Sequence, residues 1–311
     1  MAIRLGLVGL GQIARNRHVP SIAASPDFVL AAIADPRGGD PVEGVAIAAD
    51  HRAMLADDSI DAVVICTPPA ARFAIAREAL LLAGKHVVLE KPPAATMGEA
   101  EALARLAARE KLVLFATWHS QYNTAVEAAR RFLAGKKLAS FRVDWNEDFR
   151  KYHPDQGWIW EADGLGVFDM GINALSVLSR LFAHPPFVRS AELRIAANHA
   201  APLSAVLTFG SLDGDGSMEM HMDWGHTGPD QREVRIATQC GHALALLDSG
   251  GRLVIDGVVA VEEKRTEYPM LYARFAELVW RGRSDVDLVP LQMTLDALAL
   301  GRRVALPRFE G

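Results

Sequence analysis

The chain has 311 residues, of which 50% are hydrophobic, and its length favours about two domains. Its 33 basic and 38 acidic residues give a net charge of −5, which excludes a general attraction for nucleic acid or an anionic membrane. The two cysteines, Cys66 and Cys240, lack metal-ligand spacing, and no zinc motif is present. Without an apolar leader or an apolar run of about 18 residues, we expect a cytoplasmic protein that does not span a membrane.

Apolar, strand-like runs alternate with helical patterns in the first part of the chain. The runs cover residues 3–9, 28–35, 61–66, 86–90 and 112–117. Helices are expected near residues 70–83 and 97–109, the second with Thr96 as its N-cap. This alternation predicts an α/β fold with a doubly wound parallel sheet over residues 1–119.

A glycine-rich turn follows the first apolar run. Gly9-Leu10-Gly11-Gln12-Ile13-Ala14 has the spacing of a dinucleotide-binding fingerprint and begins a helix expected to end near Ala24. Gly9 permits the tight turn, Gly11 lets the backbone approach a pyrophosphate, and Ala14 lets the helix pack on the sheet. The pattern predicts a Rossmann domain with these cofactor-binding residues: Gly9, Gly11, Gln12, Ile13 and Ala14.

The second run ends at Asp35, whose carboxylate can accept hydrogen bonds from the adenosine ribose of NAD. The same charge repels the 2′-phosphate of NADP, so NAD is the preferred cofactor. Arg37 could bind that phosphate if Asp35 turned away, which leaves NADP possible. The alternative for Asp35 is a simple cap of the following turn.

Two further runs end in proline-containing turns, at the edge where doubly wound sheets bind ligands. Cys66-Thr67-Pro68 follows the third run and Glu90-Lys91-Pro92 follows the fourth. Lys91 can donate a hydrogen bond to a reacting oxygen and carry a proton, although a solvated lysine is the alternative. We expect the cofactor to contact Asp35, Arg37, Cys66, Thr67, Pro68, Glu90 and Lys91.

Beyond about residue 120 the pattern changes to consecutive strands. They are expected at residues 138–146, 187–196, 203–210, 215–224 and 232–248. Consecutive strands predict an α+β domain with a largely antiparallel sheet over residues 120–311. Helices are expected near residues 124–133, 268–281 and 290–303, and the last two are candidates to pack on the first domain.

Two clusters in the second domain have polar groups suited to a sugar. Asp169 and Asn173 lie four residues apart in a helix expected to run to Leu181, so they share one face. Residues 145–153, followed by two tryptophans, mix polar acceptors with aromatic faces, as a carbohydrate pocket requires. A capped helix and an amphipathic strand are the respective alternatives.

With these motifs, the chain resembles the glucose-fructose oxidoreductase and inositol dehydrogenase (Gfo/Idh/MocA) family over essentially its whole length. The resemblance rests on the glycine fingerprint, on Glu90-Lys91-Pro92 and on residues 166–173. It implies a Rossmann domain, a C-terminal domain with a largely antiparallel sheet, and dimers or tetramers formed through that sheet.

Within the family, residues 115–120, 158–161, 164–169 and 284–287 look like those of the bacterial L-arabinose and D-galactose 1-dehydrogenases. Many family members carry a histidine four residues after the aspartate, where this chain has Asn173. The resemblance implies that Lys91 and Asp169 are catalytic. It also implies that the substrate is held by Glu147, His153, Asn173, His119 and Trp224.

The resemblance thus implies NAD(P)-dependent oxidation of an aldose at C1 to its lactone, with D-galactose, L-arabinose or D-fucose as substrate. Lys91 would orient the anomeric oxygen, and Asp169 would take its proton directly or through Lys91. Asp35 departs from the serine and arginine pair of NADP-using arabinose enzymes, which strengthens the NAD preference. Another polyol or inositol dehydrogenase and a non-catalytic NAD-binding regulator are the alternatives.

Overall fold

The computed structural model describes residues 2–153, 156–212, 216–263 and 267–310. Its chain forms two compact units, each built on one sheet. The first unit comprises Met1–His119 and Thr266–Leu288, and the second comprises Ser120–Arg265 and Val289–Gly311. The first unit is therefore made of two separate stretches of chain. No helix among the described residues is long and apolar enough to cross a membrane.

The first unit contains a six-stranded, all-parallel sheet in the order β3-β2-β1-β4-β5-β6. Its strands are β1 (Ile3–Val8), β2 (Phe28–Ala34), β3 (Ile47–Ala48), β4 (Ala62–Ile65), β5 (His86–Leu89) and β6 (Leu114–Ala116). This order confirms the predicted Rossmann sheet, with β3 as an addition. Strand order reverses between β1 and β4, which is where doubly wound sheets bind ligands.

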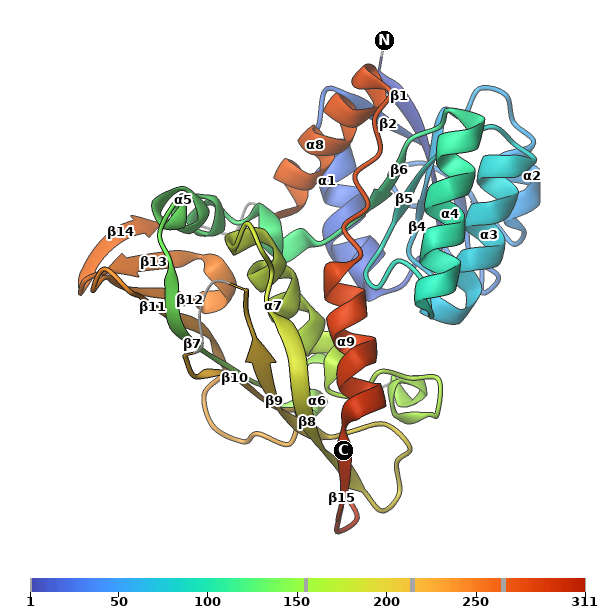
Figure 1. Cartoon of the computed structure of the whole chain (residues 1–311). Coiled ribbons are helices and arrows are strands. Elements are labelled where there is room, and N and C mark those ends of the chain that lie inside the picture. The colour runs from blue at the N-terminus through green and yellow to red at the C-terminus, as the bar shows by residue number, and fades with distance from the viewer. Residues whose placement is uncertain (1, 154–155, 213–215, 264–266, 311) are drawn as a thin grey trace. The chain divides into compact units, whose positions relative to one another are not determined.

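Helices lie on both faces of the first sheet (Figure 1). One face carries α1 (Val19–Ala23) and α8 (Glu267–Arg281), and the other carries α2 (His51–Leu55), α3 (Pro69–Leu81) and α4 (Met97–Glu110). The Oγ1 atom of Thr96 accepts the Glu99 N–H at 3.2 Å, so the predicted N-cap is confirmed.

The helix after the glycine turn is irregular. Residues 14–18 form a π-helix, in which the Val19 N–H bonds to the Ala14 carbonyl, before α1 begins. Pro20 lies just beyond and has no N–H of its own. A wide turn here moves the earlier carbonyl away from the proline ring, which would clash with it in a regular α-helix. His18, the last residue of the π-helix, is fully buried.

The second unit contains a nine-stranded sheet in the order β14-β13-β12-β11-β7-β10-β9-β8-β15. Its strands are β7 (Leu138–Asn146), β8 (Phe187–Ala196), β9 (Ser204–Gly210), β10 (Met218–Asp223), β11 (Gln231–Thr238), β12 (Ala243–Leu247), β13 (Arg252–Ile255), β14 (Val258–Glu262) and β15 (Arg302–Leu306). Most pairs are antiparallel, as predicted, but β7 pairs with β10 and β8 with β15 in parallel.

Two predictions for the second unit were wrong in detail. The single strand expected over residues 232–248 is a hairpin of β11 and β12, whose turn contains Gly241 with φ +90°. The helix expected to reach residue 303 is α9 (Val289–Leu300), which is shorter than predicted. It ends before Gly301, and the chain continues as the edge strand β15.

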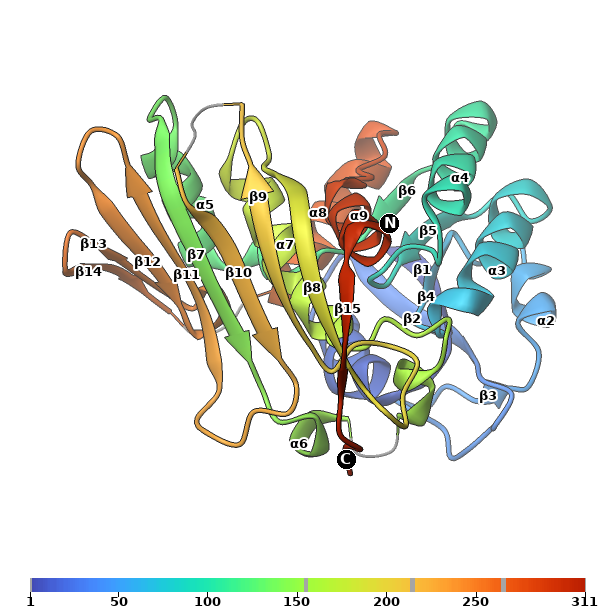
Figure 2. The same cartoon turned by 60° about the horizontal axis from the view of Figure 1, so that its bottom comes forward.

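One face of the second sheet is covered by α5 (Thr124–Leu133), α7 (Phe168–Leu181) and α9 (Figure 2). Along β7, the buried side chains of Val143 and Trp145 alternate with Arg142 and Asp144 on the opposite face. A Cβ at Gly171 of α7 would lie 2.0 Å from the Met222 sulfur, so this glycine lets α7 approach β10 closely. Shorter helices are α6 (Phe149–Tyr152), His119–Tyr122, Gly157–Trp160 and Asp248–Gly250.

Candidate active site

The two fingerprint glycines meet different surroundings. Gly9 has φ +89°, and a Cβ there would lie 3.0 Å from the Thr67 backbone nitrogen. A Cβ at Gly11 would meet nothing within 4 Å. Gly9 is therefore required where the turn after β1 packs against the turn after β4, whereas the space beside Gly11 is open to a ligand.

The residues around this turn fit a dinucleotide. The Thr67 hydroxyl is buried and has no hydrogen-bond partner among the described residues. Gln12 and Ile13 are exposed, while Ala14 is fully buried where the helix packs on the sheet. Pro68 is exposed and Cys66 is half-buried, both just after β4. Open backbone at Gly11, together with an unsatisfied Thr67 hydroxyl on the residue that packs against Gly9, suits a polar ligand at the ends of β1 and β4.

Asp35 and Arg37 form a tightly bonded pair after β2. The Asp35 carboxylate accepts two hydrogen bonds from the Arg37 guanidinium, each at 3.0 Å, and also accepts the backbone N–H groups of Leu10 and Arg37. The hydrogen bond from Arg37 lowers the pKa of Asp35 to about 2, so the carboxylate is charged at neutral pH. The Arg37 side chain is 73% exposed and is tethered beside the glycine turn.

The contrast between Gly9 and Gly11 gives a prediction. Gly9→Ala should lower the free energy of unfolding by about 1–3 kcal/mol, because alanine is strained at this φ. Gly11→Ala should leave the melting temperature unchanged. It should weaken NAD binding about tenfold, a loss of about 1.4 kcal/mol of binding free energy, because the added methyl group occupies the space where the backbone meets the pyrophosphate. Thermal unfolding and calorimetric titration measure the two effects separately. A Gly11→Ala protein that binds NAD normally would contradict the assignment.

Lys91 follows β5, in a turn held by buried protein groups. Its backbone N–H donates to Glu90 Oε2 at 2.7 Å, and its peptide bond to Pro92 is cis. The buried Arg72 of α3 donates to the Glu90 carbonyl and to the Thr67 carbonyl, both at 2.7 Å, and also to the Pro92 carbonyl. One guanidinium therefore ties the turn after β4 to the turn after β5. The available sequence signal for this role was an arginine three residues after Pro69, in the first turn of α3.

The Glu90 side chain points into the first unit. Its Oε1 atom lies 3.0 Å from His18 Nε2 and accepts the Tyr268 hydroxyl at 2.9 Å. Both carboxylate oxygens are thus engaged, and a contact of Glu90 with the cofactor stays a prediction. His119, also in the first unit, stacks on Tyr268 with ring centroids 5.4 Å apart.

Three of the substrate candidates meet in the second unit. Because β7 and β10 are parallel and Asn146 pairs with Asp223, the residues after both strands leave the same edge of the sheet. Glu147 follows β7, and its N–H donates to the Asp223 carbonyl at 2.9 Å. Trp224 follows β10, and its ring centroid lies 5.2 Å from that of His153.

Two further candidates lie on α7: Asp169, predicted to be catalytic, and Asn173, predicted to bind the substrate. Asp169 is 7% exposed and Asn173 is half-buried, one helical turn apart near the N-terminus of the helix. Gly171 lies between them and packs on Met222, two residues before Trp224. The second unit thus contains a carboxylate and an amide on α7, and a carboxylate, an imidazole and an indole at the ends of β7 and β10.

The structure adds Arg232 of β11, which sequence reasoning missed. Its Nε donates to Glu147 Oε1 at 2.7 Å, and its guanidinium also lies 3.3 Å from Asp230. The side chains of Arg232 and Glu147 are 15% and 8% exposed. Tyr152 donates its hydroxyl to Asp230, next to the same guanidinium. Arg232 therefore orients the Glu147 carboxylate, and only the pairing of β11 with β7 reveals it.

Removing this arginine is expected to damage both stability and substrate binding. Arg232→Met would leave the Glu147 carboxylate buried without its cation, which costs up to about 3–5 kcal/mol. The KM for the sugar should rise about tenfold as the carboxylate loses its orientation, equivalent to roughly one charged hydrogen bond. Thermal unfolding and steady-state kinetics measure the two effects. Arg131→Met, which removes a 76% exposed partner of Glu127, is the control and should change neither.

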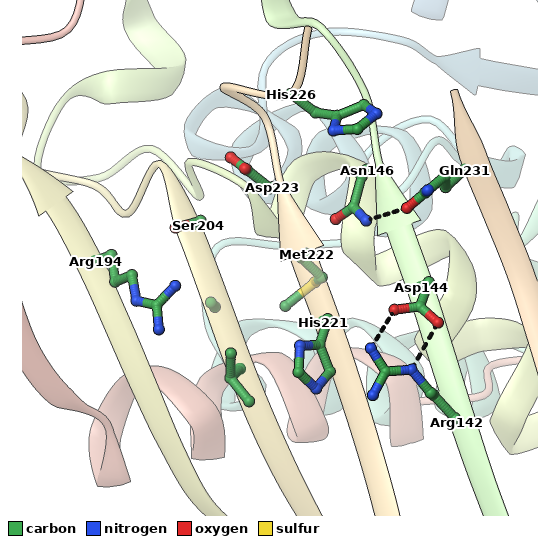
Figure 3. A pocket seen from close by; sticks show the side chains of 12 residues that line it. Arg142, Asp144, Asn146, Arg194, Ser204, His221, Met222, Asp223, His226 and Gln231 are labelled. Carbon is green, nitrogen blue, oxygen red and sulfur yellow. Dashed lines mark hydrogen bonds and ion pairs between the residues drawn. The ribbon is translucent and has the colours of Figure 1, made fainter. Parts of the chain in front are cut away.

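A polar hollow lies on the open face of the second sheet (Figure 3). Arg142 pairs with Asp144 at 2.8 Å, and the Asn146 amide donates to Gln231 at 2.7 Å. None of the predicted catalytic or binding residues lines this hollow. It belongs to the sheet surface that no helix covers.

Comparison with known proteins agrees with this fold. The model of the Gfo/Idh/MocA family, an oxidoreductase family with an NAD-binding Rossmann fold, matches residues 3–117. Galactose 1-dehydrogenase from Pseudomonas fluorescens is 41% identical over 99% of this chain and 98% of its own length. The crystal structure of a D-galactose-1-dehydrogenase protein from Rhizobium etli is 45% identical, with a TM-score of 0.93 over 99% of this chain and 98% of that one.

A more distant structure shares the fold alone. The 3-ketoreductase KijD10 from Actinomadura kijaniata, solved with NADP, is 18% identical, with a TM-score of 0.83 over 99% of this chain and all of its own. Fold and fingerprint together define an oxidoreductase that binds NAD or NADP. The chain belongs to the Gfo/Idh/MocA family.

Proposed function

We propose that this protein is a D-galactose 1-dehydrogenase that oxidises the sugar at its anomeric carbon to the lactone. The observation that carries the proposal is the likeness to two galactose 1-dehydrogenases over 98–99% of both chains. That likeness extends through the second unit, which holds the candidate sugar-binding residues, and is not confined to the nucleotide-binding domain.

The proposed chemistry is a hydride transfer from C1 with loss of the anomeric hydroxyl proton. Bound NAD supplies the acceptor for the hydride. Lys91 donates a hydrogen bond to the anomeric oxygen and stabilises the negative charge that develops there. Asp169 accepts the proton, directly or through Lys91.

The remaining polar groups are proposed to bind the ring. Glu147, oriented by Arg232, and Asn173 accept and donate hydrogen bonds to neighbouring hydroxyls. His153 and Trp224 add a polar group next to an aromatic surface, against which the apolar face of a sugar can pack. His119 is assigned a weaker, peripheral contact.

We further propose NAD as the preferred cofactor. The charged carboxylate of Asp35 next to the glycine turn supports this choice, because it accepts ribose hydroxyls and repels a 2′-phosphate. Arg37 is already bonded to Asp35, so its guanidinium is not directed to a phosphate in this arrangement.

The decisive experiment is a substrate panel that follows the absorbance of NADH or NADPH. It should contain D-galactose, L-arabinose, D-fucose, D-glucose and myo-inositol, each with NAD and with NADP. Turnover with galactose, and formation of its lactone, is the expected result. Turnover with myo-inositol alone would instead indicate a polyol dehydrogenase. NAD binding without turnover of any sugar would indicate a non-catalytic regulator.

We also propose that copies of the chain associate through the open face of the second sheet. Within the described part of the chain, helices cover only the opposite face, and the open face carries polar side chains that pair with one another, such as exposed Arg142 with half-buried Asp144. Light scattering after size-exclusion chromatography should give twice or four times the monomer mass of 33.7 kDa. A monomer at micromolar concentration would contradict this proposal.

A further inference from the structure

A buried polar cluster lies beneath the Lys91 turn, entirely inside the first unit. His18 Nε2 lies 3.0 Å from Glu90 Oε1, and His18 Nδ1 lies 2.8 Å from the Tyr272 hydroxyl. The Tyr268 hydroxyl donates to the same Glu90 oxygen at 2.9 Å. The exposed fractions are 0% for His18 and Tyr272, 2% for Glu90 and 4% for Tyr268. All four are polar side chains in the interior of a small unit.

Three elements distant in sequence provide this cluster. His18 ends the π-helical segment that follows the glycine turn, Glu90 follows β5, and the two tyrosines lie on α8. The other carboxylate oxygen of Glu90, Oε2, accepts the Lys91 N–H at 2.7 Å. A continuous chain of hydrogen bonds therefore runs from Tyr272 through His18 and Glu90 to the backbone of Lys91.

The cluster is charged. Burial by itself would raise the pKa of Glu90, but its hydrogen bond with His18 holds that pKa well below the usual range. Burial would likewise lower the pKa of His18, but its interactions with Cys66, Tyr272 and Glu90 hold it well above the usual range. The pair is therefore an imidazolium and a carboxylate at neutral pH.

A buried ion pair in this position contributes little net free energy of folding. Desolvating two charges often cancels their attraction, and well-packed apolar side chains of similar volume are commonly as stable. Stability alone therefore does not explain why His18 and Glu90 are charged. An apolar residue at position 18 could not hold the Glu90 carboxylate in the orientation that accepts the Lys91 N–H.

We propose that His18 is a positioning residue for Lys91. Together with Tyr268, His18 orients the Glu90 carboxylate. That carboxylate in turn holds the Lys91 backbone at a fixed position relative to the π-helical segment after the glycine turn. This inference rests on the proposed role of Lys91 in catalysis. In this scheme His18 touches neither substrate nor cofactor, and it acts on Lys91 through Glu90. We expect its loss to displace Lys91 while the fingerprint glycines and Asp35 stay in place.

The structural link has a readout that does not depend on activity. Pro92 and Pro93 have no amide hydrogen, so a peptide covering residues 88–93 reports hydrogen exchange mainly at Glu90 and Lys91. Exchange in this peptide should be at least about tenfold faster in His18→Phe than in the wild type, since the Lys91 N–H loses its oriented acceptor. Unchanged exchange would overturn the proposal, whatever reaction the protein catalyses.

The functional link is tested by kinetics with galactose and NAD. His18→Phe should lower kcat roughly 10- to 100-fold, the scale of a misplacement of about 1 Å, while the dissociation constant for NAD changes less than about threefold. His18→Gln, which can still donate to Glu90, should recover most of kcat. Tyr268→Phe deletes one hydroxyl, keeps the ring packed on His18, and should lower kcat about 3- to 10-fold.

The matched control is His86→Asn, at the opposite end of β5. Its Nδ1 accepts the Val113 N–H at 2.9 Å, at the start of the strand and away from the Lys91 turn. This variant should keep wild-type kcat and wild-type exchange at residues 88–93. Normal kcat in a folded His18→Phe protein, or a loss of kcat matched by an equal loss of NAD binding, would overturn the proposal. Failure of the wild type to oxidise galactose would instead overturn the proposed function and leave the exchange experiment to decide the positioning role.

Discussion

Replacing Lys91 with alanine should lower kcat for galactose by about 10²–10⁴-fold, the contribution of a positioned acid or base. The side chain begins at the carboxyl end of β5, where doubly wound sheets bind ligands, and its backbone is fixed by the Glu90 carboxylate. NAD binding should change little, because the fingerprint glycines, Thr67 and Asp35 are untouched. Steady-state kinetics with a calorimetric NAD titration separates the two effects.

A second lysine gives the control for this experiment. Lys137 is exposed in the turn before β7, and Lys137→Ala should have wild-type kcat and stability. Lys91→Arg tests the geometry, since it keeps the charge but cannot place a single compact ammonium group. Equal turnover in Lys91→Ala and the wild type would refute the catalytic role. An inactive protein that has also lost NAD binding would show a structural role instead.

Replacing Asp35 with serine should change the ratio of kcat/KM for NAD to that for NADP about 100-fold in favour of NADP. Two changes act together. The serine removes a charged acceptor of the ribose hydroxyls, each such hydrogen bond being worth about 1.5–3 kcal/mol. It also releases the Arg37 guanidinium, now tied by two bonds of 3.0 Å, to bind the 2′-phosphate.

The double variant tests that account. Asp35→Ser with Arg37→Ala should lose NAD use without gaining NADP use, because no cation is left for the phosphate. Initial rates with each cofactor at saturating galactose measure the ratio. If the single variant keeps the wild-type preference, Asp35 does not contact the ribose and only caps its turn. Both variants should also lose a little stability, because the Asp35 carboxylate accepts the Leu10 N–H and serine replaces it.

Much of the first unit could be predicted because its parallel strands are buried on both faces and appear as continuous apolar runs. The cap at Thr96 is equally local. Two elements were out of reach: β3 has two residues and α2 has five, too few for a periodic pattern. The Asp256-Gly257 turn, with both residues at positive φ, was a missed hairpin signal between β13 and β14.

In the candidate site, too, residues with a local sequence signal could be placed, whereas those identified by long-range contacts could not. Lys91 and Asp35 could be placed because each follows a recognisable strand. Their partners could not, because pairing such as that of His18 with Glu90 joins residues far apart in sequence and depends on the packed fold. Arg232 was hidden for the same reason, since nothing near residue 232 in the sequence points to Glu147.

The first unit is made of two separate stretches of chain, and this affects how the protein is synthesised. Phe275 of α8 stacks on Phe28 and Phe115, at 5.9 Å and 6.1 Å between ring centroids, and is fully buried. A chain emerging from the ribosome therefore completes the whole second sheet except β15 before it can close the core of the first. Until α8 emerges, the aromatic surface around Phe28 stays open, so the nascent nucleotide-binding domain is exposed to chaperones and proteases for most of translation.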